Sequence, residues 1–253
     1  MVADEARLQL RVSRTIDPPV FSTLQCGFTM KRLRPALGLF LIGCIAVAAF
    51  AHASFTPPNV TSVTDAYLPY EVVFDGLVVL DVSLDKRGDV IGTQALRDPG
   101  SMVPAAVTSV RTWKVKPGLL GNSAIPSEMT AVFVYRPRPN GPAAALPPKD
   151  FKPVLPHSRT DQKTDYVPPG IVSFAYPDYP ANSVAWGSVI VQITVNSEGR
   201  MENTEVLRGM APFTDLAVDA LRNWRFQAAT LNGKPVSSQL PIAFIFQTPV
   251  SLP

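Results

Sequence analysis

The chain has 253 residues, which is enough for more than one small domain together with connecting segments. Its formal net charge is only +3, and no block of Lys and Arg stands out beyond the N-terminal region, so nucleic acid is not an expected partner. The two cysteines, Cys26 and Cys44, precede all the folded patterns, which excludes a disulfide-based fold and suits an oxidising compartment.

Residues 1–53 are predicted to hold an N-terminal extension followed by a targeting segment. Met30 is followed by several basic residues and then by an apolar run, residues 36–53, that ends in small residues around His52. This order of basic flank, apolar stretch and small residues is typical of a secretory signal. Met30 is therefore an alternative start to Met1, with residues 1–29 as an upstream extension.

The fate of this apolar run has three alternatives. It is a signal peptide cleaved near Ala53, or an inner-membrane anchor, since roughly 18 apolar residues are close to the minimum for spanning a bilayer. In the third, Leu41-Ile42-Gly43-Cys44 is a lipobox-like site and the protein is a lipoprotein. All three place the rest of the chain outside the cytoplasm.

A short tether, residues 54–67, is followed by a first folded unit at 68–136. Its apolar residues Val78, Leu80, Val82 and Leu84 alternate with other residues, which predicts a strand with one buried face. A Pro-rich linker, residues 137–176, comes next. Proline at this density disfavours helix and sheet, so the linker is predicted to be extended, with a reach on the order of 100 Å.

A second unit, residues 177–248, begins with the same kind of strand. Val189, Val191, Ile193 and Val195 alternate with mostly polar residues, and Gly199 provides a tight turn into a second strand from Met201 to Leu207.

Pro212 then suits the first turn of a helix, and residues 242–246 form a final apolar strand. One apolar helix face is predicted from the spacing of Phe213, Leu216, Ala217, Ala220, Leu221 and Trp224. Residues 249–253 are a tail. The unit therefore has the order β-β-α-β and is of the α+β class.

The two units resemble each other. Aligning Gly76 with Gly187 shifts the chain by 111 positions, and the same shift, without gaps, aligns Gly88 with Gly199 and Trp113 with Trp224. The predicted fold is therefore two tandem β-β-α-β units, each a small antiparallel sheet with a helix packed on one face, joined by the Pro-rich linker.

The second unit resembles the C-terminal domain of the TonB family of energy transducers. The matching residues are Pro177, Tyr179, Pro180, Gly187, Val189, Val191, Val195, Gly199, Val206, Leu207, Ala217, Ala220, Leu221, Trp224, Arg225, Phe226, Gly233, Lys234, Pro235, Val236, Pro241 and Phe244. The first unit is a diverged copy that lacks the Tyr-Pro and Gly-Lys-Pro-Val residues, so whether it binds a partner stays open.

The resemblance implies a cell-envelope protein on the periplasmic side that supports energy-dependent transport across the outer membrane. Its partners would be a peptide segment of an outer-membrane receptor, added to the edge of the final strand, and inner-membrane motor proteins. The partner-binding residues expected here are Tyr179, Pro180, Leu240, Ile242, Phe244 and Phe246. Self-association through sheet edges is a further expectation.

A second interpretation belongs to a different class. The protein is then a non-transducing periplasmic adaptor or structural protein built from duplicated domains. The resemblance to the TonB family implies an anchor with a histidine inside its helix that couples to a motor. His52 lies at the far end of the apolar run rather than within it, which departs from this pattern and weakens direct coupling to a motor.

No catalytic, metal or cofactor site is predicted. His52 and His157 are the only histidines, and they lie in the targeting segment and the linker. The folded units therefore lack the residues for a Ser-His-Asp arrangement or a His-rich metal site, and the protein is not expected to be an enzyme.

Overall fold

A computed structural model describes residues 54–66, 74–137, 150–157, 164–180 and 183–247. All of them belong to one compact unit that spans residues 50–253. The fold is α+β, as predicted, and the described residues are mostly strands with two helices. The targeting segment and the C-terminal tail lie outside these ranges.

The first half, residues 76–136, starts with two long antiparallel strands, β3 (Gly76–Leu84) and β4 (Val90–Arg97), and helix α1 (Val103–Thr112). Three short strands follow, β5 (Lys114–Lys116), β6 (Gly118–Leu120) and β7 (Ser123–Ile125). The long strand β8 (Ser127–Arg136) completes this half.

The second half, residues 187–246, repeats this order with β11 (Gly187–Val195), β12 (Met201–Arg208) and helix α2 (Phe213–Leu221). Its short strands are β13 (Arg225–Gln227), β14 (Ala229–Leu231) and β15 (Lys234–Val236), and its last strand is β16 (Ser238–Phe246). The predicted β-β-α-β order is thus incomplete, because three short strands separate each helix from the final strand.

The turn between the first two strands of each half depends on glycine. Gly88 and Gly199 both have positive φ, at 85° and 76°. A Cβ on Gly199 would lie 2.6 Å from the carbonyl oxygen of Phe226, and one on Gly88 would collide with that of Val115. The turn predicted at Gly199 is therefore confirmed, and it brings the turn against the strand that follows the helix.

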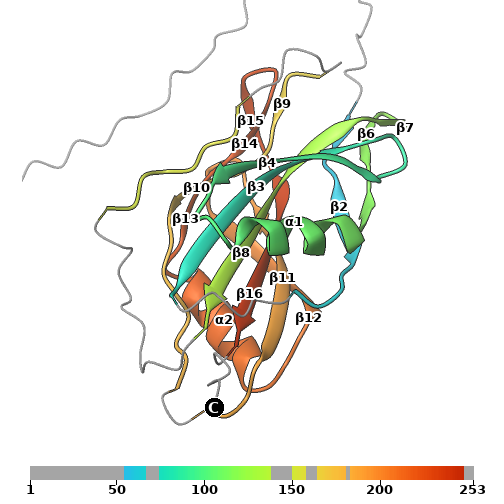
Figure 1. Ribbon diagram of the computed structural model, residues 1–253. Coiled ribbons are helices and arrows are strands. Elements are labelled where there is room, and N and C mark those ends of the chain that lie inside the picture. The colour runs from blue at the N-terminus through green and yellow to red at the C-terminus, as the bar shows by residue number, and fades with distance from the viewer. Residues whose placement is uncertain (1–53, 67–73, 138–149, 158–163, 181–182, 248–253) are drawn as a thin grey trace, which may run out of the picture. The chain divides into compact units, whose positions relative to one another are not determined.

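The two halves share a single six-stranded sheet, in the order β12-β11-β16-β8-β3-β4 (Figure 1). Within each half the long strands pair antiparallel, whereas β16 and β8 pair parallel in the middle. The expectation of two separate small sheets is therefore wrong. The two final strands carry continuous apolar runs, which are typical of strands buried on both faces.

The helices cover opposite faces of this sheet. Val132 and Val134 of β8 belong to the apolar cluster that contains α2. Their neighbours Phe133 and Tyr135 belong to the cluster that contains α1. Because successive side chains of a strand point to opposite faces, the two helices must lie on opposite sides of the sheet.

Each half is preceded by an arm that pairs with the short strands of its own half and also contacts the other half. The first arm, residues 54–66, includes β1 (Phe55–Thr56) and β2 (Asn59–Ser62), and its Val60 N–H donates to Gln192 Oε1 on β11 at 3.0 Å. The second arm, residues 164–176, includes β9 (Tyr166–Val167) and β10 (Gly170–Ser173), and its Pro169 carbonyl accepts from Thr130 Oγ1 on β8 at 2.8 Å. Each arm therefore stays paired with its own half and adds contacts between the halves.

The described part of the predicted Pro-rich linker is not extended away from the fold. Val154 pairs with Ile171 through backbone hydrogen bonds in both directions, and Phe151 contacts Phe174 edge-on at 4.9 Å between ring centroids. Ile171 and Phe174 are completely buried. The prolines limit regular sheet, but the apolar residues between them bury enough surface to hold the segment against the core.

Candidate partner-binding surfaces

The four predicted partner-binding residues on β16 are Leu240, Ile242, Phe244 and Phe246. All four side chains are fully buried in the cluster that contains α2. The strand that carries them pairs with β11 on one side and with β8 on the other. The expectation that residues 240–246 form an open edge is therefore wrong, because β8 occupies that edge. A role for these residues in partner binding stays a prediction.

Tyr179 and Pro180, the other predicted partner-binding residues, separate in space. Tyr179 is buried, its hydroxyl donates to the carbonyl oxygen of Ala185 at 2.9 Å, and its ring meets those of Phe213 and Phe246 edge-on. Burial raises the pKa of its hydroxyl. Pro180 is exposed. Only Pro180 of this pair presents its side chain to solvent, and Tyr179 packs the approach to β11.

The parallel contact between β8 and β16 is called the seam. It pairs Val132–Arg136 with Ile242–Phe246, residue by residue. The backbone N–H of Gln247 adds one hydrogen bond to the carbonyl of Arg136 at 3.2 Å. Pro241 has no N–H to donate, but it lies just before the stretch that pairs with β8. It therefore removes no hydrogen bond between β16 and β8.

The seam separates at its other end, where the second arm fills the space. The hydroxyl of Tyr166 forms a 2.6 Å hydrogen bond with Ser238 Oγ on β16. Burial raises the pKa of this tyrosine well above its usual range. Glu128 on β8 is also completely buried here. These polar residues gave no signal in the sequence, since their burial depends on the arrival of the second arm.

A buried ion pair stabilises the paired end of the seam. Arg136 Nη1 lies 2.6 Å from Asp75 Oδ2, with the arginine side chain only 2% exposed. The guanidinium also lies 5.4 Å above the ring of Tyr176. Burial, and secondarily the charge of Asp75, raise the pKa of Tyr176 to about 12. Sequence reasoning missed this pair.

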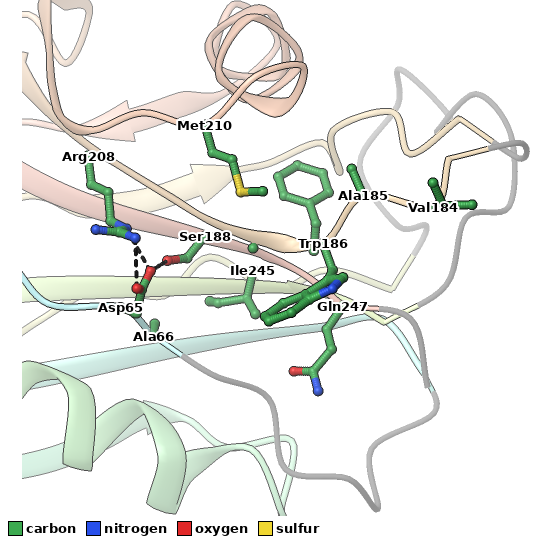
Figure 2. A pocket seen from close by; sticks show the side chains of 12 residues that line it. Asp65, Ala66, Val184, Ala185, Trp186, Ser188, Arg208, Met210, Ile245 and Gln247 are labelled. Carbon is green, nitrogen blue, oxygen red and sulfur yellow. Dashed lines mark hydrogen bonds and ion pairs between the residues drawn. The ribbon is translucent and has the colours of Figure 1, made fainter. Parts of the chain in front are cut away.

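A cavity of about 550 Å³ opens beside the start of β11. Figure 2 shows Arg208 and Ser188 converging on Asp65, with Trp186 and Met210 among the lining side chains. Arg208 Nε lies 2.6 Å from Asp65 Oδ1, and Ser188 Oγ donates to the same oxygen at 2.8 Å. Trp186 is 65% exposed. The side chains that line this cavity come from the first arm and from the second half. It was not predicted from the sequence.

The comparison with protein families decides the nature of the second half. Residues 173–247 match the family described as Gram-negative bacterial TonB protein C-terminal. Residues 173–247 form a TonB C-terminal domain. The searches of curated proteins and of solved structures gave no match.

The TonB C-terminal domain contains β11, β12, α2 and β16, and the match begins at Ser173, the last residue of β10. The predicted resemblance is thereby confirmed for the domain. That the first half is a diverged copy stays a prediction. The family is a non-enzymatic, transport-associated one, and the described residues hold no cluster of His, Cys, Asp and Glu that could bind a metal ion.

Both outer edges of the sheet carry features that disfavour the addition of another strand. The pairing of β12 with β11 and that of β4 with β3 each contain two register shifts. On β12, Glu202 and Glu205 are exposed. Bulges and exposed charges are common means of protecting an edge strand. Self-association through sheet edges therefore stays a prediction without further support.

The predicted anchor, residues 36–53, lies outside the described ranges. Within those ranges, neither helix is long and apolar enough to cross a membrane.

Proposed function

We propose that this protein is a TonB-like cell-envelope protein that binds an extended segment of a partner protein and supports energy-dependent transport across the outer membrane. The observation that carries this proposal is the TonB C-terminal domain at residues 173–247. On the side away from β11, β16 pairs parallel with β8 of the same chain, which is the kind of backbone pairing that strand addition would use.

The proposed location is the periplasmic side of the cell envelope. The targeting segment then serves either as an anchor, residues 36–53, or as a signal cleaved near Ala53. The N-terminus and the membrane association of the native protein distinguish the two. Retention of residues 36–53 in a salt-resistant membrane fraction favours an anchored transducer that contacts inner-membrane motor proteins.

The proposal is tested by photo-crosslinking in cells. A crosslinking amino acid replaces Pro180, the exposed member of the predicted partner-binding set, and a matched control replaces Lys86 on an exposed turn of the first half. We expect the Pro180 probe to capture an outer-membrane receptor and the Lys86 probe to capture none. Equal capture by both probes, or no receptor with either, contradicts the proposal.

A second candidate function is a non-transducing periplasmic adaptor or structural protein. It is favoured by one observation, that β16 lies inside the sheet between β11 and β8 rather than at an edge. Deletion of the gene separates the two candidates. An adaptor leaves receptor-dependent uptake unchanged, whereas loss of uptake excludes it.

A further inference from the structure

We propose that β8 is a built-in occupant of the β16 edge, and that a partner strand binds β16 only when β8 leaves. We further infer that such a strand must be apolar on both faces. This inference rests on the proposed function only in assuming that the partner binds by strand addition. The inference concerns which segment closes the edge of β16 and which peptide sequences this edge accepts.

The length of the seam makes β8 replaceable in principle. β8 pairs with β3 over almost its whole length, from Ser127, opposite Leu84, to Tyr135, opposite Gly76. It pairs with β16 only from Val132 to Arg136. Toward Ser127 the two strands part, and the second arm fills the space between them. The ladder between β8 and β16 is therefore short, and the two strands are already apart at one of its ends.

Because the β8 residues in the seam are buried, a strand that takes the place of β8 must have side chains that suit burial on both faces. Val132 and Val134 face the α2 side, Phe133 and Tyr135 face the α1 side, and all four are completely buried. An incoming strand would meet an apolar cluster on each face. A segment that alternates apolar and polar residues, as an ordinary edge strand does, would place unpaired polar groups in one of these clusters.

In addition to its ladder with β3, β8 is held by two side-chain contacts, and a third contact joins the two arms. The Asp75–Arg136 ion pair holds its end, and the Pro169–Thr130 hydrogen bond holds its start. The rings of Phe55 and Tyr166, one from each arm, meet at 4.6 Å between centroids. Withdrawal of β8 therefore requires the ion pair to break and the arms to loosen, which makes the seam a closed site rather than an open edge.

A locked form of the full chain tests this directly. Val132 and Ile242 are neighbours in the seam, so the V132C/I242C variant, made with C26S and C44S, can be joined by a disulfide. The probe is a fluorescent synthetic peptide of residues 127–136, the β8 sequence. We expect the reduced variant to take up this peptide slowly and the oxidised variant to bind at least about tenfold less, because its β8 cannot leave.

An opening variant and a matched peptide complete the test. R136A removes the ion pair that holds β8 and should accelerate peptide uptake relative to the unchanged chain. A peptide with Ser in place of Val132 and Val134 should not bind to any form, because its polar groups would enter the α2 cluster.

The outcomes are decisive in both directions. Equal binding to oxidised and reduced chains, or no binding to R136A, overturns the inference. Binding of the Ser-containing peptide overturns the requirement for two apolar faces. If the peptide results fail while receptor crosslinking and uptake persist, only this inference is wrong. If the peptide exchanges as expected but deletion leaves uptake intact, the proposed transport function is wrong.

Discussion

Trp224 donates its indole N–H to the carbonyl oxygen of Ala175 at 2.9 Å, whereas Trp113, its counterpart under the 111-residue shift, has none of the described residues as a partner for its buried indole N–H. Both tryptophans are almost fully buried. The two halves thus place the same large side chain in the same position, but among the described residues only Trp224 has an acceptor for its indole N–H.

This difference predicts unequal effects of W224F and W113F. Both variants lose a similar apolar area, but only W224F leaves the buried carbonyl of Ala175 without its donor. We expect W224F to lower the free energy of unfolding by about 1–2 kcal/mol more than W113F. Urea unfolding followed by circular dichroism measures both. Equal losses would mean that the Trp224–Ala175 hydrogen bond contributes nothing net.

The two arginine–aspartate pairs are expected to contribute very differently to stability. Arg136 is 2% exposed in its pair with Asp75, whereas Arg208 and Asp65 are 43% and 60% exposed. R136A removes a buried guanidinium from beside the partly buried Asp75, and we expect a loss of about 3 kcal/mol. R208A should cost about 1 kcal/mol or less, and salt should reduce this further.

Urea unfolding at low and high salt compares the two arginine variants. R208A serves as the matched control, since it removes the same side chain from an exposed pair. A larger loss for R208A than for R136A would contradict the assigned importance of burial.

Alkaline pH is expected to destabilise the fold through Tyr176. Burial raises its pKa to about 12, above that of an unfolded tyrosine near 10, so the folded state favours the neutral hydroxyl. The sign follows from linkage: the stabilisation is complete below pH ~10 and is lost as the pH rises toward about 12, where the unfolded state binds fewer protons.

Tyr176→Phe removes the contribution of Tyr176 and is the variant to compare, while the raised pKa values of Tyr166 and Tyr179 remain in both proteins. Its stability should fall less than that of the unchanged chain over the same alkaline range, as measured by urea unfolding at several pH values. Ultraviolet absorbance of tyrosinate follows the titration itself. A parallel decline of both proteins would exclude Tyr176 as a contributor.

Cutting the chain between its halves should not separate them. A protease site inserted between residues 140 and 148 divides the chain after β8. We expect the fragments to elute together, because the seam and the contacts of each arm with the other half join them. Denaturant should release them. Separation under native conditions would instead mean that the halves are independent units on a linker.

Local patterns were readable from the sequence because they depend on neighbours along the chain. Alternation around Val191 predicted β11, and Gly199 predicted a turn that requires positive φ. The spacing of Phe213, Ala217 and Leu221 predicted the buried face of α2, but Trp224, predicted on the same face, lies beyond the end of the helix. The residues of the TonB C-terminal domain were likewise recognisable in order. Each of these signals arises from steric or periodic constraints within one element.

The partners of each strand were decided only by the tertiary structure. The backbone of β16 offers the same hydrogen-bonding groups to any neighbouring strand, whether a receptor peptide or β8. The residues of β16 therefore do not indicate which strand lies beside it. The continuous apolar run at residues 242–246 was a usable sign of burial on both faces, but it does not name the neighbour. Likewise, the prolines of the linker predicted extension, while burial of Ile171 and Phe174 in the apolar cluster that contains α2 determined where the second arm lies.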